Sequence, residues 1–112
     1  MPHCIVEHSG IHEIDTVMGV VNKCALNSKL FSKNGEDIKV RAVQFDKYLM
    51  ADGSANFIHI VLKILAGRSS DQISQLLNNT MEALDDLQLS SITITIEVLV
   101  IDKARYLKRI IT

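Results

Sequence analysis

The order in which hydrophobic patterns follow one another is the feature of this sequence that most constrains its fold. Short β-branched stretches with strand periodicity and longer stretches with helical periodicity occur as strand, helix, strand, and this order occurs twice. The repeat divides a single domain, 1–112, into pseudo-repeat units 1–52 and 53–112. Strands joined through a helix pair in parallel by a right-handed crossover. The sequence therefore predicts an α/β two-layer sandwich, with a four-stranded sheet and both helices on one face.

The first unit begins with an apolar segment at residues 2–8, which predicts a strand. Residues 13–31 place apolar side chains at helical spacing and predict a helix. After the turn signal of Asn34 and Gly35, the segment "IKVRAVQF" alternates in the manner of a strand. Its two predicted faces differ, because one carries Ile38, Val40 and Ala42 and the other carries Lys39, Arg41, Val43 and Phe45.

The second unit repeats this order. The segment "NFIHIVLKILAG" at 56–67 predicts a strand that is apolar on both faces, and residues 70–87 predict a helix that begins at the capping sequence "SSDQ". Residues 91–101 alternate isoleucine and valine with Thr93, Thr95 and Glu97, which predicts the last strand. For residues 102–112 the pattern fits either a short strand or an ordered arm.

Composition excludes several classes of partner. A formal net charge of -1 provides no field that would attract nucleic acid or an anionic membrane. No stretch resembles a signal peptide or the roughly 20 apolar residues of a membrane span, so we expect a cytoplasmic protein with neither nucleic-acid nor membrane partners. The two cysteines, Cys4 and Cys24, are expected to be reduced core residues.

Apolar residues make up 47% of the chain and aromatic residues only 4%, which predicts an aliphatic core rich in β-branched side chains. In a two-layer sandwich the helices cover one face of the sheet and leave the other uncovered. Because the predicted strands are rich in isoleucine, that second face requires a partner. The sequence therefore predicts an oligomer.

Two familiar kinds of site are not indicated. His3, Cys4, His8 and His12 are close in sequence, but strand alternation places His3 opposite Cys4 and His8. No metal site is therefore expected. The segment "LAGRSS" has one glycine and lacks the lysine spacing of a phosphate-binding loop.

Arg68 and Pro2 are the residues with the best case for chemistry. Arg68 lies between a predicted strand and a predicted helix, where its guanidinium would lie beside free helix N–H groups and bind an anion. The alternative is a surface arginine that pairs with Asp71 or with a neighbouring subunit. Pro2 would carry a secondary amine if Met1 were removed, and an apolar pocket with nearby cations would lower the pKa of that amine toward the range of a general base. The alternative is that a proline at position two has no functional role.

Three segments carry a resemblance to a known family. "MPHCIVEHS", "MADGSANFIHIVLKILAGRSSDQ" and the helix that follows resemble 5-carboxymethyl-2-hydroxymuconate isomerase, of the tautomerase superfamily, and "HIVLKILAGRSSDQISQLLNNTMEAL" resembles 4-oxalocrotonate tautomerase. The resemblance is weakest over 9–38 and after 102. It implies a homotrimer of two-layer subunits that isomerises a small carboxylate substrate without a cofactor or a metal.

The resemblance also implies roles for individual residues. Pro2 would be the catalytic acid and base, and Arg68 would bind a substrate carboxylate or stabilise the dienolate. A second family arginine aligns with Lys39, while Arg41 lies on the same strand face, so either Lys39 or Arg41 is expected to contribute further positive charge. Lysine keeps the charge but lacks the two-pronged geometry of arginine.

The implied reaction converts an unsaturated 2-hydroxy polycarboxylate to its 2-oxo form. Other activities of the same superfamily are alternatives, namely phenylpyruvate tautomerisation, hydration or dehalogenation of a small acid. A further alternative is a trimeric binding protein without activity. The presence or absence of Met1 distinguishes this inactive binding protein from the enzymes. With Met1 in place, the Pro2 nitrogen is an amide and has no basicity.

Overall fold

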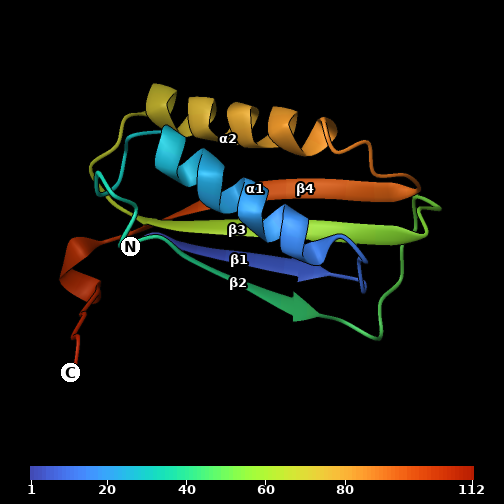
Figure 1. Cartoon of the computed structure of the whole chain (residues 1–112), viewed down its shortest axis with the longest axis horizontal. Helices are drawn as coiled ribbons and strands as arrows, with labels where there is room; N and C mark the ends of the chain where they lie inside the picture. Colours follow the sequence, from blue (N-terminus) through green and yellow to red (C-terminus); the bar gives the residue numbers. More distant parts are fainter.

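The computed structural model describes residues 1–112, and it has the predicted two-layer architecture, with a four-stranded sheet and two helices that cover one of its faces (Figure 1). The elements in chain order are β1 (His3–His8), α1 (Ile14–Asn27), β2 (Lys39–Gln44), β3 (Asn56–Leu65), α2 (Ser70–Asp85), β4 (Ile92–Ile101) and a short 3₁₀ helix (Lys103–Arg105). No helix combines the length and the apolar character that crossing a bilayer requires.

The sheet joins the two strand–helix–strand units through their first strands. Its order is β2-β1-β3-β4, with β1 parallel to β2, β3 parallel to β4, and β1 antiparallel to β3. The central pair sets the register, because His3 is opposite Lys39 on one side and opposite Lys63 on the other. The beginning of β1 therefore meets the end of β3 at one end of the sheet.

Two boundaries differ in detail from the predicted ones. The first helix ends at Asn27 and does not continue to Phe31, because Lys29 adopts a φ of 60° that stops helical hydrogen bonding. The Ser28 hydroxyl donates to the Ala25 carbonyl at 2.6 Å and further stabilises this end. The C-terminal segment is an arm and not a strand, and it begins with a 3₁₀ turn in which the Asp102 carboxylate accepts from the Ala104 N–H at 3.0 Å.

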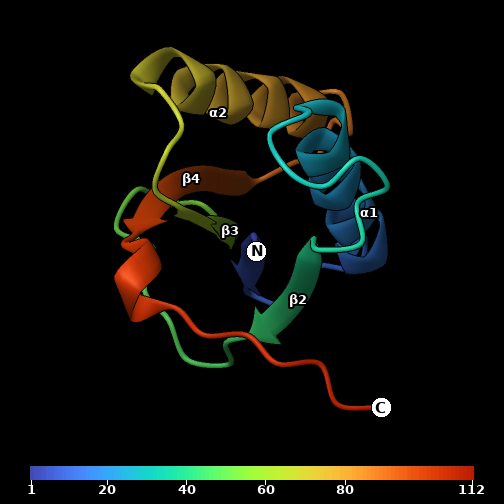
Figure 2. The same cartoon turned by 90° about the vertical axis from the view of Figure 1, so that its left-hand side faces the viewer.

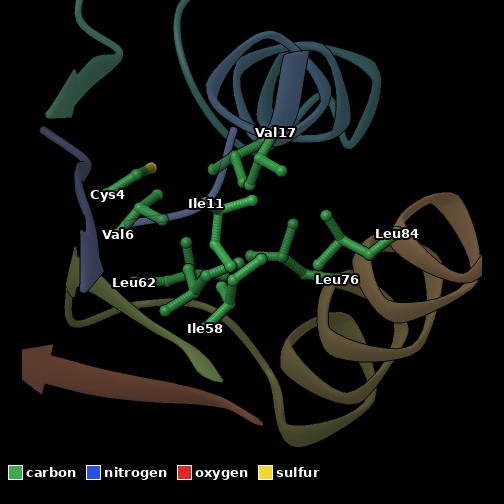
Figure 3. Packing of buried hydrophobic residues seen from close by; sticks show 10 residues of the cluster. Cys4, Val6, Ile11, Val17, Ile58, Leu62, Leu76 and Leu84 are labelled. Atoms are coloured by element: carbon green, nitrogen blue, oxygen red, sulfur yellow. The ribbon is translucent and has the colours of Figure 1, made fainter. Parts of the chain in front are cut away.

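The core lies between the helices and the covered face of the sheet. Alternate residues of β1 and β3 point into it, and Val17 of α1 and Leu76 and Leu84 of α2 meet them from the other side (Figure 3). The strand residues that contribute to the cluster are Cys4, Val6, Ile58, Ile60 and Leu62. Both cysteines are free thiols, as expected, and burial raises the pKa of the Cys4 thiol to about 11.

The start of α2 follows the predicted capping sequence. The Ser69 hydroxyl accepts from the Gln72 N–H at 3.1 Å, and the Gln72 side chain accepts from the Ser69 N–H at 2.8 Å. This capping box fixes the first turn of α2 directly after Arg68.

The open face of the sheet is mixed in character and not rich in isoleucine. The isoleucines at positions 92, 94 and 96 of β4 pack against the core cluster, so Thr93, Thr95 and Glu97 lie on the open face. His59 of β3 bonds with both neighbours there, through Nδ1 to the Thr95 hydroxyl at 2.6 Å and through Nε2 to the Glu97 carboxylate at 2.5 Å. Val61 beside them is only 9% exposed.

His8 connects β1 to α1 in a way that depends on its protonation state. Its Nδ1 accepts hydrogen bonds from the backbone N–H groups of Gly10 and Ile11, each at 3.0 Å. The side chain is 5% exposed, and burial lowers the pKa of His8. A protonated Nδ1 would lose both interactions, so the folded chain holds His8 neutral.

Replacing His8 by leucine is expected to destabilise the chain by about 1–3 kcal/mol at pH 8, because the buried N–H of Ile11 and the partly buried N–H of Gly10 lose their acceptor. The folded pKa lies below the unfolded value of about 6.5, so the contribution of His8 is fully present above pH 6.5 and decreases as the pH falls below it. Urea unfolding of the wild type and His8→Leu at pH 8 and pH 5.5 measures this. His12→Gln, at an exposed histidine, serves as the control. An equal difference at both pH values would contradict the interpretation.

Candidate active site

The Pro2 ring is buried between the sheet and the helices. It is less than 2% exposed and lines a narrow pocket that is too small for a water molecule. His3 pairs with Lys63 in the antiparallel β1–β3 pair. Pro2, which precedes His3, therefore neighbours Ile64, which follows Lys63, and both residues line this pocket. The other lining residues are Cys4, Val21, Ala25, Phe31, Leu62, Leu76 and Thr80. The surroundings of the ring are therefore almost entirely apolar.

The amino terminus lies beside a lysine. Met1 is 7% exposed, and burial lowers the pKa of its amino group, as does the positive charge of Lys39. Lys108 of the C-terminal segment lowers the pKa further, whereas the carboxylate of Asp37 opposes these effects. Lys39 is held in place by two bonds: its N–H donates to the Pro2 carbonyl at 3.1 Å, and its Nζ donates to the Asp37 carbonyl at 3.2 Å.

Arg68 follows β3 and faces the segment after α1. Its Nη1 donates to the Leu65 carbonyl at 3.0 Å and its Nη2 donates to the Leu30 carbonyl at 2.6 Å. Its guanidinium carbon lies 5.2 Å from the centre of the Phe31 ring, which is cation–π geometry. A guanidinium has five N–H donors, so the two that these carbonyls engage leave three for a ligand. Arg68 forms no ion pair with Asp71.

Arg41 lies on the open face of the sheet. Its Nη1 donates to Nδ1 of His3 at 3.0 Å, and Nε2 of His3 bonds with the Tyr106 hydroxyl at 3.0 Å. Because arginine can only donate, the His3 ring accepts at Nδ1 and carries its proton on Nε2. Burial lowers the pKa of His3, and the charge of Arg41 is the next cause. Arg41 is thus engaged with a neutral histidine and with no carboxylate.

The structure brings three of the four sequence-predicted residues to one end of the sheet. The backbone N–H of Lys39 donates to the Pro2 carbonyl, and Phe31 both lines the Pro2 pocket and contacts the Arg68 guanidinium. Arg41 is directed to His3 instead. Both chain termini also lie at this end (Figure 1).

Three further residues at this end were missed by the sequence analysis. Phe31 was assigned only as the end of a helix, although it is one of three phenylalanines in a chain poor in aromatic residues. Tyr106 and Lys108 lie in the segment whose conformation was left open. No local signal identifies Tyr106, because its hydrogen-bond partner is 103 residues away in the sequence.

No group of three or more histidine, cysteine or carboxylate side chains is placed to hold a metal ion. The chemistry that the arrangement offers is that of an amino terminus in an apolar setting with cations beside it. Burial and neighbouring cations favour the unprotonated form of such an amine, and a guanidinium nearby stabilises negative charge. The tandem strand–helix–strand fold and this terminus are the features that the resemblance to the tautomerase class implies.

Comparison with known proteins identifies the family within that class. The family model described as 5-carboxymethyl-2-hydroxymuconate isomerase matches residues 2–109, and the chain belongs to that family. The protein is therefore an isomerase of the tautomerase type. Among curated proteins, none matched in sequence.

Solved structures share the fold at low sequence identity. A 5-carboxymethyl-2-hydroxymuconate isomerase from Deinococcus radiodurans R1 is 24% identical, with 96% of this chain and 88% of that chain covered and a TM-score of 0.80. A 5-carboxymethyl-2-hydroxymuconate delta-isomerase is 18% identical, with 98% and 88% covered and a TM-score of 0.73. A fused 4-OT that forms a symmetric trimer is 17% identical, with 93% and 91% covered and a TM-score of 0.70.

Replacing Arg68 by lysine tests whether the guanidinium joins the two segments. Lysine keeps the charge but cannot reach both carbonyls and stack on Phe31, so we expect a loss of about 1–2 kcal/mol in the free energy of unfolding. Urea denaturation measures the loss, and Arg105→Lys, at an exposed arginine, is the matched control. Equal stability of the two variants would show that the contacts of Arg68 contribute nothing.

Proposed function

We propose that this chain, once Met1 is removed, isomerises an unsaturated 2-hydroxy polycarboxylate to its 2-oxo form, with Pro2 as the catalytic base and acid. The observation that carries the proposal is the setting of the amino terminus. Burial and the charge of Lys39 lower the pKa of the amino group that Met1 carries. The Pro2 nitrogen is one residue along the chain, so the same causes would lower the pKa of its amine.

The reaction needs only one proton carrier. The Pro2 nitrogen takes the proton of the 2-hydroxyl group, and the resulting dienolate spreads its negative charge along the conjugated chain. The protonated amine then returns the proton to a carbon of that chain, which leaves a 2-oxo group and shifts the double bonds. The proton count balances, and no oxidant or reductant is required. An amine with a lowered pKa suits both steps, because it must accept and release a proton at similar pH.

Arg68 and Lys39 would bind the carboxylates of the substrate and the developing oxyanion. Arg68 keeps three N–H donors beyond those that the Leu65 and Leu30 carbonyls use. Lys39 is the better candidate for the second cation, because its charge acts on the amino terminus whereas the Arg41 guanidinium bonds with His3. Two cations beside the base favour a substrate with several carboxylates over a neutral enol.

We further propose that the subunits form a homotrimer through the open face of the sheet. Within one chain no helix covers this face and only the C-terminal arm lies on its side of the sheet, and the face carries the well-buried Val61 and the His59–Glu97 pair. The structurally similar fused 4-OT is a symmetric trimer. The same assembly would cover the open face of this sheet.

The first experiment compares preparations with and without Met1. Intact mass identifies each preparation, and turnover of 2-hydroxymuconate-type dienols is followed by absorbance. Met1-free protein is expected to be active, and Met1-retaining protein is expected to lose at least about 10²-fold in kcat/KM, because an amide cannot act as a base.

The Met1-free Pro2→Ala variant is expected to turn over these dienols more slowly than the wild type. Wild-type protein without turnover, or Pro2→Ala at the wild-type rate, would refute the role of Pro2. Turnover of only a 2-oxo acid or a halogenated acid in the same panel would favour another activity of the superfamily.

Replacing Lys39 by glutamine tests the second cation. Loss of one charge-assisted contact is expected to raise KM for a dicarboxylate dienol by about tenfold or more. Lys47→Gln removes the same charge from an exposed position after β2 and is expected to leave KM unchanged. Equal KM values for the two variants would remove Lys39 from the binding site.

A further inference from the structure

The C-terminal arm, residues 102–109, is an ordered part of the end of the molecule where the amino terminus lies. Figure 2 shows the segment after β4 on the side of the sheet away from the helices. It begins with the 3₁₀ turn of Lys103–Arg105 and continues in extended conformation to Tyr106. Neither strand pairing nor helix packing accounts for its position beyond that turn. Its contacts are made by individual side chains.

We propose that Arg41, His3 and Tyr106 form a clamp that holds the C-terminal arm against the amino terminus, so that Lys108 becomes part of the candidate active site. In this proposal Arg41 is a positioning residue and not a substrate ligand. The relevance of the clamp to catalysis rests on the proposed function of Pro2. The clamp itself is a structural feature that can be tested without substrate.

The hydrogen bonds of the clamp are directional. Arg41 donates to Nδ1 of His3 at 3.0 Å, which fixes the tautomer with a proton on Nε2. That proton points to the Tyr106 hydroxyl, 3.0 Å away. The two rings also meet edge to face, with centroids 5.9 Å apart and an angle of 65° between their planes. Tyr106 is therefore held by a hydrogen bond and by ring packing at once.

Strand register explains why the clamp is next to the active-site candidate. His3 directly follows Pro2 and is the first residue of β1, and its partner in β2 is Lys39. Because successive side chains of a strand alternate, His3 lies on the open face while the Pro2 ring lies on the covered face. An arm held on His3 thus approaches the amino terminus from the open side, where the Pro2 nitrogen would be exposed by the loss of Met1.

A second contact holds the base of the arm. The Ala66 N–H donates to the Ile101 carbonyl at 2.9 Å, so the end of β4 stays joined to the segment that precedes Arg68. The Nζ of Lys103 lies close to Gly67, within 3.8 Å of the position that a Cβ atom would take there. The arm therefore begins beside Arg68 and reaches His3 through Tyr106.

The course of the C-terminal arm places one of its lysines among the charges that act on the amino group. Lys39 of β2 and Lys108 of the arm lower the pKa of the amino group, and Asp37 opposes them. His3 faces Arg41, Lys39 and Lys63 as well as the amino terminus, and all of these cations disfavour its protonation. The clamp thus uses a histidine that stays neutral, and the cation that the arm adds near the base comes from Lys108.

The test uses full-length, Met1-free protein and two measurements that need no turnover. The first is hydrogen exchange of residues 102–109 in the wild type and in Tyr106→Phe, which keeps the ring but removes the hydroxyl. We expect exchange of the arm to become about fivefold faster, as the loss of one hydrogen bond predicts.

The second measurement is an NMR titration of the Pro2 amine in Lys108→Gln and in Tyr106→Ala. Both changes are expected to raise the pKa of this amine, because the arm's cation is removed or released.

Arg109→Gln is the matched control, because it removes the same charge from the adjacent, exposed position of the arm. It is expected to shift the Pro2 titration less than Lys108→Gln. The proposal is overturned if exchange of the arm in Tyr106→Phe equals that of the wild type, or if Lys108→Gln and Arg109→Gln titrate alike. Wild-type protein that turns over no dienol, together with the expected exchange and titration results, would refute the proposed function and leave the clamp intact.

Discussion

The alternation of side chains along β1 is the constraint on which the rest of this structure depends. Every second residue of the strand enters the core beneath the helices, and the residues between them face the open side. Pro2 and Cys4 therefore line an apolar pocket, whereas His3 lies among cations on the other face. A shift of the register by one residue would exchange these surroundings, and the amino terminus would lose its apolar setting.

The same register concentrates positively charged side chains at one place in a chain whose net charge is close to zero. The formal net charge is -1, yet the beginning of β1 lies between Lys39 and Lys63, and Arg68 follows the end of β3. Asp37, the acidic group that acts on the amino terminus, is itself engaged by the Ser32 hydroxyl at 2.6 Å. The local field therefore favours a neutral amine and bound anions, although the whole molecule would not attract a polyanion.

The strands could be predicted because period-two alternation is a local property, and the motifs at the N-terminus and at residues 50–72 supplied the family. The end of α1 could not be predicted from the sequence, because it depends on the left-handed backbone conformation of Lys29. The partners of Arg68 were also beyond the sequence, since the Leu30 carbonyl is 38 residues away. Division of the chain into units 1–52 and 53–112 stays a prediction, as do the roles of Pro2, Arg68, Lys39 and Arg41.

Met1 affects both the chemistry and the space at this end of the molecule. Its covalent bond makes the Pro2 nitrogen an amide, and Met1 is only 7% exposed, with its amino group near Lys39. The pocket that the Pro2 ring lines is too narrow for water, so a substrate cannot approach from the covered face. In the proposed function, access would therefore come from the side that Met1 occupies. In the proposed function, removal of Met1 would both create the base and open the path to it, and the residues around that opening, including those of the C-terminal arm, would decide which acids can enter.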